Sequence, residues 1–160
     1  MAGNKARLGA NDLGIDVKAG SDRAFFKWLV ACQLFGARIS QDIAARAFAE
    51  LDKAGVLTPR KLAAADWQRI VDLLGKGGYR RYDESTAREL ITMGKEVRDK
   101  YAGSVSKLLA GAANKQEIQE RLQTFKGIGP TAAGIFLREV PRGVLAKAGK
   151  RSADSNVTDS

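Results

Sequence analysis

The sequence predicts an all-α fold in a single compact helical domain, and three observations support this class. Apolar residues recur at helical spacing in most segments, no run alternates apolar and polar residues for long, and β-branched clusters are scarce. The chain has 160 residues, of which 44% are hydrophobic, and this suffices for a sizeable core. We expect a flexible N-terminal arm over residues 1–20, a helical domain over 21–148 and a polar C-terminal tail over 149–160.

Capping signals place the first four helices. Ser21-Asp22 precedes a helix that is apolar around nearly its whole circumference, as a central core helix requires. Its end is predicted at Gly36, where the apolar pattern stops. Three further starts follow from a capping residue or from a capping residue before proline. The predicted segments are Ser40–Lys53, a short helix from Thr58-Pro59, and Asp66–Gly75.

A glycine-rich basic turn with interleaved tyrosines, residues 76–82, separates these helices from the second half of the chain. A long helix over Asp83–Tyr101 and a short one over Ser104–Leu109 come next. Asn114, with Glu117 three residues later, resembles a capping box and begins a further helix. We predict that this helix and a last one beginning at Pro130 are joined by a tight hairpin, so that the pair covers residues 115–139.

The charge favours a polyanionic partner, because 27 Lys and Arg oppose 18 Asp and Glu for a net charge of +9. Nucleic acid is the first candidate. Zinc and iron–sulfur chemistry are disfavoured, since Cys32 is the single cysteine and histidine is absent. No run is long and apolar enough for a membrane span, and the first residues lack the hydrophobic run of a secretory signal. We therefore expect a monomeric cytoplasmic, nucleoid-associated protein, or a nuclear one in a eukaryote, without a required cofactor.

The most specific motif is the stretch Leu122-x-x-Phe125-Lys126-Gly127-Ile128-Gly129-Pro130-Thr131. The glycines permit a tight turn and a close approach of another backbone, while Ile128 can point into the core. Free N–H groups of the turn and of the following helix start then form an anion site, backed by the helix dipole and by Lys126. We predict that Lys126, Gly127, Ile128, Gly129 and Thr131 bind phosphate. The alternative is an interhelical turn without a ligand.

With Ala133 four residues beyond Gly129, this motif resembles the helix-hairpin-helix of the base-excision DNA glycosylases of the endonuclease III superfamily. The resemblance extends over about residues 22–140 and includes Trp28–Leu51 and the Gly-aromatic turn at Gly77-Gly78-Tyr79. It implies a six-helix domain in which the hairpin holds DNA phosphates, often with a monovalent cation (Na or K) at the Gly127 and Gly129 backbone. It also implies that a loop after the first core helix probes the base stack, which places Phe35 and Arg38 near DNA.

The resemblance also limits the chemistry. Bifunctional members carry a lysine nucleophile at the position of Thr131, whose neutral hydroxyl cannot form an iminium, so only a monofunctional glycosylase that uses water is expected. Such members need a carboxylate about twenty residues beyond the hairpin, and Asp154 is the candidate catalytic residue. The four-cysteine cluster and most of the C-terminal helices are missing. A non-catalytic helix-hairpin-helix DNA-binding protein and a helical protein-binding adaptor therefore stay open as alternatives.

Further side chains are predicted to extend the contact with double-stranded DNA, some by charge and some by stacking. They are Phe35, Arg38, Tyr79, Arg80, Arg81, Arg138, Arg142, Lys147 and Lys150.

Overall fold

A computed structural model describes residues 8–110 and 112–141 of the chain. Over these residues the protein consists of eight α-helices and two short 3₁₀ helices, with no strand, and the all-α prediction is confirmed. The α-helices are α1 Asp22–Gly36, α2 Gln41–Lys53, α3 Pro59–Ala63, α4 Trp67–Lys76, α5 Asp83–Lys100, α6 Val105–Ala110, α7 Lys115–Leu122 and α8 Pro130–Glu139.

Side-chain caps explain why the helices begin where the sequence predicts. In each of five helices, the residue before the first turn accepts a hydrogen bond from a backbone N–H three residues later. These caps are Ser21, Ser40, Thr58, Asp66 and Asn114. The capping box of α7 is shifted by one residue, because Glu117 accepts from the N–H of Ala113 rather than from that of Asn114.

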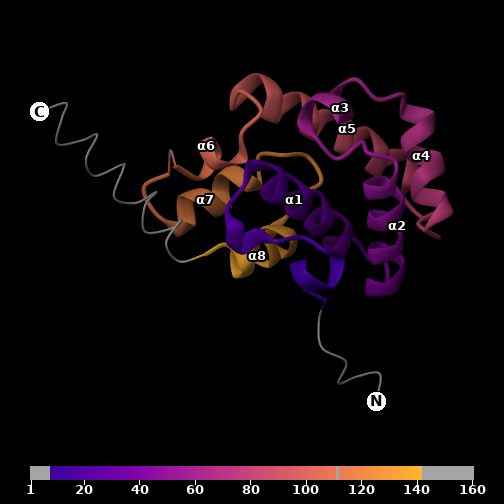
Figure 1. The fold of residues 1–160 in the computed structure, drawn as a ribbon, viewed down its shortest axis with the longest axis horizontal. Helices are drawn as coiled ribbons and strands as arrows, with labels where there is room; N and C mark the ends of the chain where they lie inside the picture. Colours follow the sequence, from indigo (N-terminus) through magenta and orange to yellow (C-terminus); the bar gives the residue numbers. More distant parts are fainter. Residues whose placement is uncertain (1–7, 111, 142–160) are drawn as a thin grey trace, which may run out of the picture.

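Helix α1 lies at the centre of the molecule, between α2 and α8, with which it packs (Figure 1). The α3, α4 and α5 helices lie on the α2 side, where α3 packs on α5 and α4 packs on both α2 and α5. On the other side, α7 packs on α8 and α6 lies against α1. The predicted role of α1 as the core helix is confirmed, since ten of its fifteen residues are buried.

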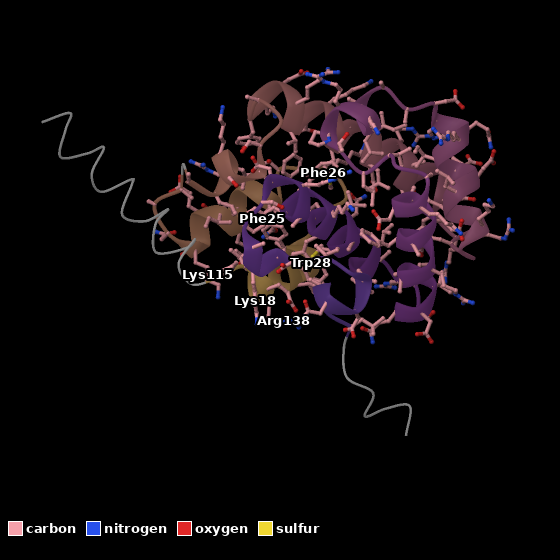
Figure 2. All side chains as sticks on the ribbon, in the orientation of Figure 1. Lys18, Phe25, Phe26, Trp28, Lys115 and Arg138 are labelled. Carbon is pink, nitrogen blue, oxygen red and sulfur yellow. The ribbon has the colours of Figure 1, made fainter. Side chains whose placement is uncertain are left out.

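The labelled Phe25, Phe26 and Trp28 of α1 show how this helix organises the core (Figure 2). All three side chains are at most 1% exposed. The Trp28 Nε1–H donates to the carbonyl of Phe136 on α8 at 3.3 Å, and this satisfies the one polar atom of the indole. The pair therefore fixes α8, whose first residues form the hairpin, against α1.

The N-terminal arm is shorter than predicted. Residues 10–13 and 17–19 form the 3₁₀ helices η2 Ala10–Leu13 and η3 Val17–Ala19, and the side chains of Ala10, Ile15 and Val17 are buried in the core. The prediction of a flexible arm over residues 1–20 is thus wrong for 8–20. Burial of three apolar side chains offsets the conformational entropy that this glycine-rich segment loses when it becomes ordered. Residues 1–7, and the tail predicted for 149–160, lie outside the described residues.

None of the helices among the described residues is both long and apolar enough to cross a membrane.

Candidate nucleic-acid interface

The turn between α7 and α8 has the local structure that its sequence predicts. Phe125 and Ile128 are 1% and 4% exposed and anchor the turn in the core. The N–H of Phe125 donates to the carbonyl of Leu122 at 3.2 Å, and the N–H of Ile128 donates to the carbonyl of Phe125 at 3.0 Å. The chain is thereby folded into two successive tight turns between the helices.

The Ile128 amide departs from the prediction, because a hydrogen bond inside the protein already occupies it. Ile128 acts as a hydrophobic anchor and its N–H is not free for phosphate. By contrast, the backbone N–H groups of Gly127, Gly129 and Thr131 donate no hydrogen bond to any described residue, and all three residues are exposed. The predicted phosphate-binding set is therefore reduced to these three amides and Lys126.

Two of the free amides, those of Gly129 and Thr131, lie at the start of α8, which is ten residues long and has Pro130 in its first turn. Proline lacks an N–H, so no donor is wasted at this position. The amino end of a helix carries partial positive charge, and exposed N–H groups there can hold an anion. Lys126 is exposed beside them and forms no ion pair with any described residue, so its ammonium is available to the same ligand.

Gly127 has a structural requirement that Gly129 lacks. Its φ is +97°, and a Cβ added there would lie 2.5 Å from Gln33 Nε2 and 2.7 Å from Glu89 Oε1. Gly129 has a φ of −99°, and a Cβ added there would meet no atom within 4 Å. Only Gly127 therefore needs to be glycine for the fold. The expected restricted conformation at Gly129 is not present, and that position faces open space where a ligand can approach.

The two side chains behind Gly127 form a polar pair between α1 and α5. Gln33 Nε2 donates to Glu89 Oε1 at 3.2 Å, and the side chain of Gln33 is buried. Its other amide atom, Oε1, is buried without a hydrogen-bond partner among the described residues. The pair supports the inner side of the turn at Gly127.

The loop predicted to probe DNA lies beside the hairpin. Gly36, the last residue of α1, packs on α8, where a Cβ at Gly36 would lie 3.0 Å from the Cβ of Ala132. Arg38 follows in the exposed turn before α2. Phe35 is only partly exposed, and its ring lies 6.4 Å from that of Trp28 between centroids, so it packs on the core.

The basic turn before α5 divides into a buried and an exposed part. Tyr79 is 0% exposed and its hydroxyl pairs with Thr86 Oγ1 at 3.0 Å, so the predicted contact of Tyr79 with DNA is wrong. Burial of the phenol raises the pKa of Tyr79. Arg80 and Arg81 are both exposed, as the prediction requires.

The remaining basic residues are placed only in part. Arg138 is exposed on the face of α8 that also carries Thr131, since residues 131, 134 and 138 are exposed at helical spacing. In Figure 2 its label lies at the lower edge of the molecule, together with that of Lys18. Asp154, Arg142, Lys147 and Lys150 lie outside the described residues.

Gln33 and Glu89 are the site residues that sequence reasoning missed. Gln33 is a polar residue in a mostly apolar part of α1, and this is the feature of the sequence that could have indicated a special role. Glu89 is one of several acidic residues on α5, and nothing in the sequence distinguishes it, because its contact with Gly127 depends on the tertiary fold.

No group of three or more side chains typical of metal sites comes together in the described part of the chain. The Gly129 carbonyl accepts the N–H of Ala133, whereas the carbonyl of Gly127 accepts no hydrogen bond from the described residues. Backbone carbonyl oxygens are suitable ligands for a monovalent cation. Of the two glycine carbonyls, that of Gly127 is the one without a hydrogen bond from the described residues.

Comparisons with protein-family models, with characterised proteins and with solved structures find no match for this chain.

Proposed function

We propose that the protein binds double-stranded DNA through the hairpin between α7 and α8. The observation that carries the proposal is a set of exposed N–H groups, that of Gly127 in the turn and those of Gly129 and Thr131 at the amino end of α8, none of which donates a hydrogen bond to a described residue. Three backbone donors around one turn suit the oxygens of a single phosphate. The net charge of +9 favours the approach of a polyanion over that of a small neutral ligand.

The electrostatic balance at the turn makes Lys126 important. Glu89 lies on the inner side of Gly127 and opposes an anion there, although Gln33 donates one hydrogen bond to its carboxylate. The dipole of α8 and the charge of Lys126 act in the opposite sense. Because Lys126 forms no ion pair with any described residue, its full charge remains for the phosphate.

The finer proposal is base excision by a monofunctional DNA glycosylase of the helix-hairpin-helix type. Thr131 is exposed in the first turn of α8, at the position where a lysine would act as nucleophile, and its hydroxyl cannot form an iminium. Water must then attack C1′ of the sugar while the bond to the base breaks and the base leaves with the electron pair. Asp154 is proposed to accept the proton of that water or to stabilise the developing sugar cation.

Charge reversal at Lys126 tests DNA binding. Lys126→Glu is expected to weaken binding to a 20-base-pair duplex by roughly 5- to 50-fold near 0.1 M salt, and to lower the dependence of log Kd on log salt by about one. Lys115→Glu is the matched control, since this exposed lysine lies at the far end of α7 and the variant has the same net charge. Circular dichroism checks that both variants fold.

Equal losses in the two variants would show that only net charge matters. Unchanged affinity in Lys126→Glu would remove the hairpin from the interface and favour the protein-binding adaptor.

A lesion panel separates the enzyme from a binding module. Duplexes with uracil, an alkylated base, oxidised guanine or a mismatch are incubated with the protein and then cleaved with alkali. The glycosylase proposal expects product from at least one duplex, and loss of that product in Asp154→Asn. Binding without product for any lesion would leave a non-catalytic DNA-binding protein.

A further inference from the structure

We propose that Tyr82, with Arg81, forms a stacking platform for an unpaired base of DNA bound at the hairpin. This inference rests on the proposed DNA binding and adds the structure of the preferred DNA to it. The partner is a duplex that presents at least one base outside the stack, such as a bulge, a gap or a flipped nucleotide.

Exposure singles out Tyr82. It is 43% exposed, and no other large hydrophobic side chain among the described residues is as exposed to solvent. Tyr79, three residues earlier, shows that this turn is able to bury a tyrosine completely and satisfy its hydroxyl. The ring of Tyr82, by contrast, stays at the surface although burial of an aromatic ring is favourable, so packing of the core does not explain a tyrosine at this position.

The backbone at Tyr82 does not explain the aromatic residue either. Tyr82 has a φ of +71° and a ψ of +11°, a left-handed conformation that favours glycine. It also occupies the N-cap of α5, where its side chain makes no capping hydrogen bond. Ser, Thr, Asp or Asn fills that position in α1, α2, α3, α4 and α7. A glycine or asparagine would suit this local structure better than tyrosine does.

Arg81 gives the ring an orientation and a charge. Its guanidinium carbon lies 5.2 Å from the centre of the Tyr82 ring, in a cation–π arrangement. One face of the ring is thus associated with Arg81, which leaves the exposed remainder for a ligand. Lys76, Arg80 and Arg81 slightly outnumber the adjacent Asp83 and Glu84, so the turn is mildly basic. This combination of a π face and cations is the chemistry by which proteins hold unpaired nucleobases.

Position relates the platform to the hairpin. Glu89 contacts the inner side of Gly127 and lies seven residues after Tyr82 along α5. Seven residues of helix rise about 10 Å, so Tyr82, at the N-cap of α5, lies at the end of the same helix that supports the hairpin through Glu89. One short DNA segment can span the platform and the hairpin.

The test compares two duplexes of the same sequence, one fully paired and one with a single bulged 2-aminopurine. Tyr82→Ala is expected to weaken binding to the bulged duplex by roughly 5- to 100-fold, the usual effect of removing one base–aromatic stack, and to leave the paired duplex little changed. Tyr82→Phe should retain the affinity, and Tyr82→Leu should not. The fluorescence of 2-aminopurine should be quenched by the native protein and not by Tyr82→Ala.

Two further variants keep the outcomes distinct. Tyr82→Gly removes the ring and relaxes the left-handed backbone, so its loss of binding to the bulge cannot result from unfolding.

Lys126→Glu should weaken binding to both duplexes. If it does so while Tyr82→Ala weakens neither, the stacking proposal is overturned and the hairpin proposal stands. If both variants bind both duplexes as the native protein does, both proposals fail. A loss in Tyr82→Leu no greater than in Tyr82→Phe would also overturn stacking.

Discussion

Replacing the two hairpin glycines one at a time by alanine should give very different stabilities. In Gly127→Ala the new methyl group would lie 2.5 Å from Gln33 Nε2 and 2.7 Å from Glu89 Oε1, and the φ of +97° is unfavourable for alanine. In Gly129→Ala the methyl group meets no atom within 4 Å, and the φ of −99° is open to any residue.

The magnitude for Gly127→Ala follows from two contributions. The left-handed backbone costs about 1–2 kcal/mol for a residue with a Cβ. Displacing Gln33 or Glu89 breaks a hydrogen bond to a charged group, which costs about another 1.5 kcal/mol or more. The free energy of unfolding should fall by roughly 2.5–4 kcal/mol in Gly127→Ala, which lowers Tm by about 8–15 °C for a chain of this size. In Gly129→Ala the change should stay within about 0.5 kcal/mol.

Urea and thermal unfolding followed by circular dichroism measure both values. A double-mutant cycle with Glu89→Ala separates the contribution of Glu89 from that of the backbone, because removing the carboxylate removes both its contact with the new methyl group and its hydrogen bond with Gln33. Gly127→Ala should then be less costly in the Glu89→Ala background than in the native one. Equal stabilities of the two single alanine variants would refute this account of the turn, as would a cycle with no coupling between positions 127 and 89.

Two further predictions concern titratable groups on α1. Partial burial of Asp22 raises the pKa of its carboxyl, but hydrogen bonds from Ser106 and Ser104 and the charge of Lys107 together lower that pKa below 3.8. Since the folded pKa is the depressed one, Asp22 stabilises the fold above pH 3.8, and this contribution is lost as the pH falls through the folded value. The Tm of Asp22→Asn should therefore depend less on pH than that of the native protein between pH 5 and about 2.5, and parallel curves would contradict the assignment. Burial raises the pKa of the Cys32 thiol well above its ordinary value, so a thiol reagent at pH 8 should modify Cys32 only after unfolding in urea. Modification of the native protein at the rate of a free thiol would contradict that burial.

The parts of the fold that sequence alone predicts are those set by local interactions. A capping side chain bonds a backbone N–H only three residues away, so Ser21, Ser40, Thr58, Asp66 and Asn114 mark helix starts without any knowledge of tertiary structure. The hairpin is local in the same sense. Its buried anchors follow from the spacing of apolar residues within one turn, whereas the spacing of the glycines does not tell which of the two has the positive φ.

Properties that depend on distant partners are where the predictions fail. Tyr79 and Tyr82 share one turn, and the sequence does not distinguish them. Which one is buried depends on how the turn lies against α2, where a Cβ at Gly77 would come 2.5 Å from the backbone of Ala47. The burial of Ala10, Ile15 and Val17 likewise depends on core surfaces that form only when the helices have packed.

The Gln33–Glu89 pair lies behind Gly127 and supports the exposed turn from the inner side. Three segments distant in the sequence meet there, with Gln33 from α1, Glu89 from α5 and the glycine from the hairpin. Gln33 Oε1 is a buried amide oxygen without a partner among the residues that the structure describes, and Glu89 is a carboxylate close to a proposed anion site, so each is unfavourable taken separately. Together they occupy the inner side of the turn with groups that an added methyl would displace, so position 127 is restricted to glycine. The conformation of the turn thus depends on the contact between α1 and α5 that Gln33 and Glu89 form.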